Sequence, residues 1–285
     1  MMLQPAQWRE RQQAHEAAID ERVSARQHRR SRGLTHPVWD FLFDYYPVRV
    51  SHLRRWHPGL GITLADPGQT SPHRGWAGYR SDGGAVYCDS TSYVAKHHTM
   101  LAGIDSLLAA ARNQPARFDC FGLHEWAMVY RTDQPRHDLP LRLGHAGTDA
   151  VVDAHRLRCT HFDAYRFFTP AARPLNLTVL TRGTQTEHEQ CGCLHATMDL
   201  YKWCLKMGPL VPGELLLAAF DLAVECRRLD MEASPYDCRS YGLGVVAIET
   251  AEGKAEYVRR QRELARQGEA IRDRLRRILA AATIE

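Results

Sequence analysis

The chain has 285 residues, 44% of them hydrophobic, which is enough to bury a sizeable core without disulfide bonds. Its formal net charge of +4 is below what binding nucleic acid by charge alone requires. No apolar run reaches the roughly 20 residues of a membrane-spanning helix, and no apolar signal region opens the chain. We therefore expect a cytoplasmic protein with no membrane partner, whose eight cysteines are reduced, mostly buried and without a disulfide-linked partner.

The first part of the chain, residues 1–58, is basic and aromatic and is predicted to be helical. A charge-rich helix is expected over residues 5–32, ending before Gly33, because glycine commonly follows a helix end. Residues 35–46 and 48–56 are predicted to form two further helices. The first of these two is apolar on nearly all sides, so we expect it to be buried.

A change of composition separates residues 60–90 from the helical body predicted over residues 92–285. Residues 60–90 are rich in Gly, Pro and Ser, and the string Ser81-Asp-Gly-Gly84 predicts a hairpin. Residues 151–168 fit either a strand or broken helices. The fold class is therefore mainly α, a single helical domain over residues 1–285 with a small β element near residues 60–90. The helices expected in the body span residues 92–112, 118–131, 187–207, 213–231 and 252–282.

His195 and Asp199 lie four residues apart in a segment without Gly or Pro, residues 194–207. On a helix they project from one face, beside the apolar side that packs against the rest of the protein. A buried polar site is built in this way, and so is a structural salt bridge. Both interpretations stay open.

Four polar clusters interrupt apolar segments of the body. Unpaired polar groups are costly to bury, so we expect the clusters to meet in the interior. The clusters are His124-Glu125, His161 with Asp163, His195 with Asp199, and Asp230 with Glu232. Imidazoles and carboxylates from several helices suit iron or manganese. The candidate metal ligands are His124, Glu125, His161, Asp163, His195 and Asp199.

The same clusters also suit a catalytic carboxylate that works without a cofactor. Asp199 or Glu125 would act as general base or stabilise a developing cation, with His195 or His161 setting its protonation and orientation. Aromatic side chains from these segments would stack against a flat, positively charged base. Arg54 and Arg55 would hold phosphates while a nearby Trp stacks a base. The candidate substrate-binding residues are Trp126, Tyr165, Tyr201, Trp203, Arg54, Arg55 and Trp56.

Three strings resemble a family of actinobacterial proteins labelled 3-methyladenine DNA glycosylase, over nearly the whole chain. They are His36-Pro-Val-Trp-Asp-Phe-Leu-Phe-Asp-Tyr-Tyr46, Leu53-Arg-Arg-Trp-His-Pro-Gly59 and Met198-Asp-Leu-Tyr-Lys-Trp203. The resemblance implies a DNA-repair hydrolase that cleaves the N-glycosidic bond to an alkylated base, with DNA or a nucleoside-like small molecule as partner and no metal. The helix-hairpin-helix and the zinc clip of other glycosylases are absent from the sequence, so no catalytic residue is carried over from them.

Two alternatives accompany the glycosylase hypothesis. The first is a non-haem iron or manganese enzyme that uses the clustered histidines and carboxylates as ligands. The second is a nucleic-acid-binding protein without catalysis, for which the basic segment from Arg26 to Arg55 would suffice.

Overall fold

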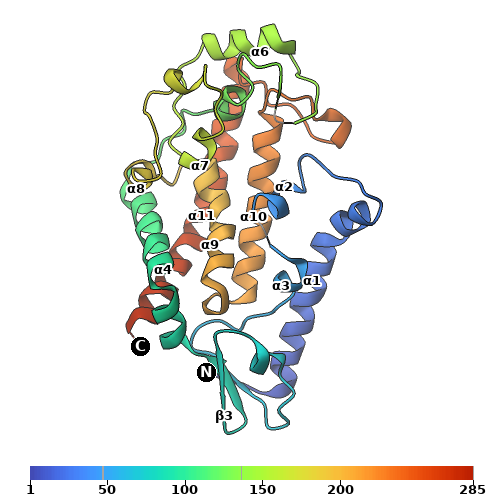
Figure 1. Cartoon of the computed structure of the whole chain (residues 1–285), viewed down its shortest axis with the longest axis vertical. Coiled ribbons are helices and arrows are strands. Elements are labelled where there is room, and N and C mark those ends of the chain that lie inside the picture. Colours follow the sequence, from blue (N-terminus) through green and yellow to red (C-terminus); the bar gives the residue numbers. More distant parts are fainter. Residues whose placement is uncertain (47, 136, 285) are drawn as a thin grey trace. The chain divides into compact units, whose positions relative to one another are not determined.

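A computed structural model describes residues 1–46, 48–135 and 137–284, and it confirms the mainly helical fold with a small sheet (Figure 1). The chain forms two compact units. The first unit contains Met1–Asp105, Leu200–Asp221 and Ile271–Glu285, and the second contains Ser106–Asp199 and Leu222–Ala270. Four long helices supply residues to both units: α4 (Ser90–Asn113), α9 (Leu194–Met207), α10 (Gly213–Glu232) and α11 (Ala251–Ile284). The single domain predicted over residues 1–285, with parts meeting near residues 58 and 92, stays a prediction.

The first unit opens with the predicted charge-rich helix, α1 (Pro5–Ser31), drawn in blue in Figure 1. Its start is fixed by a proline in the first turn and by the backbone N–H of Gln4, which donates to Oε1 of Gln7 at 2.8 Å. Its end precedes Gly33, whose φ of +69° suits glycine. The helix buries one stripe of side chains at helical spacing: Trp8, His15, Ile19, Val23 and Arg26.

A four-stranded sheet in the order β1-β2-β4-β3 completes this part of the first unit. The hairpin predicted at residues 81–84 is confirmed, since Gly83 and Gly84 join β3 to β4 with φ of +53° and +86°. The sequence did not predict β1, because two residues are too few to show alternation. The strands are β1 (Met2–Leu3), β2 (Thr63–Ala65), β3 (Tyr79–Asp82) and β4 (Ala85–Cys88).

The helices predicted over residues 35–46 and 48–56 are shorter than expected. Only α2 (Phe41–Asp44) and α3 (Val50–Leu53) form. Side chains before α2 take backbone groups that a helix would use: Oδ2 of Asp40 accepts the N–H of His36 at 2.8 Å, and Nδ1 of His36 accepts the N–H of Val38 at 3.2 Å.

In the second unit, the helix predicted over residues 118–131 is reduced to α5 (Leu123–Ala127). Phe121 and Gly122 precede it with φ of +50° and +75°, which interrupts any helix running through them. Residues 151–168 resolve into the end of one helix and a separate short one. The remaining short helices are α6 (Gly144–Asp153), α7 (Phe162–Tyr165), α8 (Gln185–His188) and the 3₁₀ turns η1 (Pro72–Gly75), η2 (Arg173–Leu175), η3 (Gly208–Leu210) and η4 (Arg239–Tyr241).

Two further expectations concern cysteines and membranes. All eight cysteines are free thiols, and five of them are fully buried. Among the described residues, every helix is too short or too polar to cross a bilayer.

Candidate metal centre

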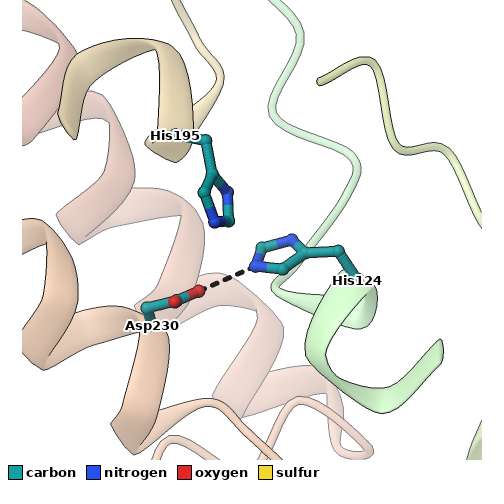
Figure 2. Close-up of side chains that lie close together, drawn as sticks. All are labelled: His124, His195 and Asp230. Carbon is teal, nitrogen blue, oxygen red and sulfur yellow. Dashed lines mark hydrogen bonds and ion pairs between the residues drawn. The ribbon is translucent and has the colours of Figure 1, made fainter. Parts of the chain in front are cut away.

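Three short stretches of the second unit bring two imidazoles and a carboxylate together. His124 lies on α5, His195 in the first turn of α9 and Asp230 near the end of α10. All three are buried, and one ligand atom from each lies within 4.8 Å of the other two. Figure 2 shows the His195 ring pointing toward the pair formed by His124 and Asp230. Phe121 and Gly122, with φ of +50° and +75°, lead directly into α5, which carries His124.

His124 and Asp230 form a buried ion pair, with Nε2 of His124 2.7 Å from Oδ1 of Asp230. Burial alone lowers the pKa of His124, but the Asp230 carboxylate outweighs it and raises that pKa well above its usual value. Burial likewise raises the pKa of Asp230, but the charge of His124 overcomes it and holds the pKa below its usual value. The imidazole Nδ1 lies 3.4 Å from Sγ of Cys120. A proton therefore occupies the position between His124 and Asp230.

His195 differs from its neighbour because its imidazole makes no hydrogen bond to any residue that the structure describes. Burial and then the charge of His124 lower the pKa of His195 to about 3, so its imidazole is neutral near pH 7. The ring centroids of His124 and His195 lie 4.5 Å apart. A neutral imidazole beside a carboxylate is the form in which histidine binds metals.

A second histidine–carboxylate pair adjoins this group. Nε2 of His161 lies 3.4 Å from Oδ2 of Asp199, and both side chains are buried. The His161 ring stacks on that of His195 with centroids 5.3 Å apart and planes inclined by 23°. His195 and Asp199 thus share a helix face, as the sequence predicts. The His195 ring lies against that of His124, and the Asp199 carboxylate contacts Nε2 of His161.

A buried arginine closes the arrangement. Nη1 of Arg227 lies 3.0 Å from Oδ2 of Asp230 and 3.7 Å from Oε1 of Glu125, and Arg227 is only 1% exposed. The guanidinium contacts Oδ2 of Asp230, whereas His124 contacts Oδ1. We call the seven residues the core cluster: His124, Glu125, His161, His195, Asp199, Arg227 and Asp230.

A pocket of about 330 Å³, its open mouth included, reaches three histidines of the core cluster. The enclosed part of the pocket measures about 10 Å³, which is room for about one water molecule. Arg117 and Arg158 stand at the pocket with side chains about 40% exposed, and both lie near Asp119, at 3.7 and 2.7 Å. The lining also includes His124, His161, His195, Tyr257 and Gln261.

Five of the six metal ligands proposed from sequence meet in the core cluster, and Asp163 does not. Oδ1 of Asp163 lies 2.8 Å from Arg182 and 3.5 Å from Arg166, which accounts for its burial. Glu125 is in the cluster but contacts Arg227 rather than the three ligand atoms.

The proposed substrate-binding residues lie at separate places. In the second unit, Trp126 is fully buried and donates its indole N–H to the carbonyl of Ala233. Tyr165 is buried on α7. In the first unit, the following rings are buried and so do not present a stacking face: Trp56, Tyr201 and Trp203.

The two arginines proposed to hold phosphates have partners inside the first unit. Arg54 forms ion pairs with Glu16 and Asp20, both at 3.4 Å, and Arg55 lies over the Trp76 ring. A phosphate would have to compete with these contacts.

Sequence reasoning placed Asp230 in a polar cluster but did not propose it as a ligand, and it missed Arg227, Tyr257 and Gln261. The signal for Asp230 and Arg227 was present: they are oppositely charged residues three apart on a predicted helix, which places them close enough to pair. Tyr257 and Gln261 left no such signal, because they resemble ordinary positions on the buried side of α11.

No family model, no curated protein and no solved structure matches this chain. The resemblance to glycosylases therefore stays an expectation, and function has to be argued from the site.

Proposed function

We propose that this chain is a non-haem metal enzyme whose single iron or manganese ion is held by His124, His195 and Asp230. One observation carries the proposal: two imidazoles and one carboxylate, all buried, bring their ligand atoms within 4.8 Å of one another. Two histidines and one carboxylate leave further coordination positions open, which is the ligand set of non-haem iron enzymes. A modest tightening of the three side chains would bring each atom to metal-ligand distance.

The charge of the core cluster supports a divalent cation. The Asp230 carboxylate lies 2.7 Å from Nε2 of His124 and 3.0 Å from Nη1 of Arg227, so its buried negative charge is held by cationic neighbours. In the metal-free protein, the proton on His124 offsets part of this charge, and metal binding would release that proton.

The second histidine pair supports a catalytic role for the site. His161 lines the pocket and its Nε2 lies 3.4 Å from Oδ2 of Asp199, which supports a role in exchanging a proton with a ligand there. A bound iron or manganese ion would supply Lewis acidity, and iron also redox chemistry. His161 and Asp199 would serve as the proton-transferring pair and its positioning partner.

The size of the pocket limits what can enter it: a substrate of the metal enzyme would have to react at its open mouth, and a purine cannot be enclosed in it. An extruded purine needs a pocket that encloses its ring system. The room beside His195 holds about one water molecule. The glycosylase function remains a prediction without support from this pocket.

Elemental analysis of the purified full-length chain tests the proposal. Protein produced with iron and manganese in the medium should contain one of them stoichiometrically, and Asp230→Asn should lose it. Asp163→Asn is the matched control, because it removes a buried carboxylate of the same unit that pairs with Arg182 instead of the ligands.

Two outcomes would contradict the metal function. A folded wild-type protein that takes up neither ion would remove its basis. Release of free base from alkylated DNA by metal-free protein would favour the glycosylase instead.

A further inference from the structure

Two side chains of α11 that line the pocket each have a buried polar atom without a hydrogen-bond partner among the described residues. The hydroxyl of Tyr257 is one, and Oε1 of Gln261 is the other. The two residues are 0% and 2% exposed. Being four apart on a helix, they share one face. Buried polar atoms without partners are rare and costly, so two in one pocket indicate a missing polar ligand.

The hydrogen-bonding character of each atom is fixed by its surroundings. Nε2 of Gln261 donates to the carbonyl of Gly192 at 2.7 Å, so the other end of the amide, turned away from Gly192, is the acceptor Oε1. Burial raises the pKa of Tyr257 well above its usual value, so its hydroxyl keeps its proton and can donate. The pocket thus offers one donor and one acceptor.

Packing holds the tyrosine in place. A Cβ built on Gly122 would lie 3.3 Å from the Tyr257 ring and 3.3 Å from Ala233, so the ring sits directly against the backbone that leads into α5. That backbone carries His124 two residues later. Tyr257 is therefore positioned rigidly with respect to a proposed metal ligand.

We infer that Tyr257 and Gln261 position a water molecule next to the metal ligands, and that water is the co-substrate of a metal-assisted hydrolysis. This rests on the metal function proposed above. A water oxygen can accept the Tyr257 proton and donate to Gln261, and the room available is about one water molecule. Dioxygen, the alternative co-substrate of such a centre, has no proton to donate to the Gln261 carbonyl.

The reaction balances without a further reagent. The water oxygen forms a bond to the electrophilic carbon or phosphorus of the substrate, and the bond to the leaving group breaks with its electron pair. The water proton passes to the imidazole of His161, which then returns it to the leaving group. Tyr257 and Gln261 touch only the water, so they are positioning residues.

Three measurements on the full-length protein, with Mn²⁺ as the probe ion, test the inference. Crystal structures of metal-free and Mn²⁺-loaded protein should show an ordered water within hydrogen-bond distance of Tyr257 and Gln261. Tyr257→Phe should bind Mn²⁺ with unchanged stoichiometry but about 10-fold more weakly, because outer-shell hydrogen bonds support metal ligands. The metal-free variant should melt close to wild type, since it loses one hydrogen bond to a water molecule and no contact with another side chain.

Tyr130→Phe is the matched control, because the Tyr130 hydroxyl already donates to Asp153 in the same unit, away from the pocket. It should leave Mn²⁺ affinity unchanged. A Tyr257→Phe variant that melts well below wild type with unaltered Mn²⁺ affinity would show a purely structural tyrosine and overturn the inference.

The crystal structures also separate this inference from the metal function. Manganese bound by the three ligands with no water at Tyr257 and Gln261 would keep the metal function and reject the hydrolytic co-substrate. A water held by both side chains in a protein that binds no Mn²⁺ would reject the metal function and metal-assisted hydrolysis, but keep the positioning role.

Discussion

Each unit of the molecule buries a histidine cluster, and the two clusters differ in what their nitrogens face. In the first unit, Nε2 of His73 contacts the carbonyl of Trp56 at 2.7 Å and its Nδ1 lies 2.9 Å from Oγ of Ser71. Nε2 of His15 contacts the carbonyl of Leu53 at 2.8 Å. These contacts are to neutral backbone and hydroxyl groups, while Nδ1 of His15 has no hydrogen-bond partner among the described residues. Aromatic rings surround His73.

In the second unit, the imidazoles of His124 and His161 face carboxylates, and His195 faces a pocket with no hydrogen bond of its own among the described residues. Burial is common to both clusters and so does not mark a functional site. The charge of the partners distinguishes the second cluster.

The largest expected effect comes from removing the carboxylate charge of the second cluster. Asp230→Asn leaves the His124 and Arg227 cations in the core without their closest partner, and the metal-free protein should lose about 3 to 5 kcal/mol of unfolding free energy. Urea unfolding at pH 7 measures this. A loss below about 1 kcal/mol would mean that His124 is neutral there and that the ion pair is absent.

The free energy of unfolding contributed by His73 in the first cluster should depend on pH. Burial lowers the pKa of His73 to about 4, so between pH 6.5 and 4 this residue binds a proton in the unfolded chain but not in the folded protein. Stability from this residue is complete above pH 6.5 and falls by about 3 kcal/mol as the pH drops toward 4. Urea midpoints of wild type and His73→Asn across this range test it, and the variant should show a flatter profile. Parallel profiles would contradict the prediction.

Metal should stabilise only through the second cluster. At 100 times its Kd, Mn²⁺ should raise the unfolding free energy of wild type by about 2.7 kcal/mol, and chelation should reverse the gain. His195→Ala should abolish the gain and His73→Asn should retain it, as followed by thermal melting with and without Mn²⁺. An equal rise in melting temperature with Mn²⁺ in both variants would contradict the prediction that only the second cluster binds the ion.

The smallest effect is expected at Asp199. Its contact with His161 is long, at 3.4 Å, and an amide keeps the shape of the side chain, so Asp199→Asn should cost about 1 kcal/mol of stability and leave the metal content unchanged. Urea unfolding and elemental analysis check both. A loss of 3 kcal/mol or more would identify Asp199 as a structural ion-pair partner, and not as the positioning partner of His161.

The sequence predicts the long helices and the hairpin because their signals are local. The glycine at residue 33 marked the end of the charge-rich α1, apolar spacing identified α9 and α11, and the Gly83-Gly84 turn identified the hairpin. The short helices α2 and α5 were overestimated, because side-chain hydrogen bonds and positive φ angles interrupt patterns that read as continuous.

The site was predictable in its residue types but not in its pairing. Helical spacing placed His195 and Asp199 on one face, and the cost of burying polar groups indicated that the clusters meet. Which histidine faces which carboxylate depends on contacts such as that of His124 with Asp230, and periodicity carries no information over that separation. Tyr257 and Gln261 could not be predicted for another reason. They were identified by buried polar atoms that make no hydrogen bond to the described residues, and the sequence does not show which atoms lack a partner.

The pairing of His124 with Asp230 also sets an order of events during synthesis, because the two residues are 106 positions apart. At the usual rates of translation, about 5 to 20 s pass between the synthesis of one and of the other. Until α10 leaves the ribosome, His124 and His195 have no carboxylate to complete a ligand set, so a nascent chain cannot retain the ion through this centre. Loading of the proposed ion would therefore follow translation of most of the chain, and cells short of the ion would accumulate protein without it.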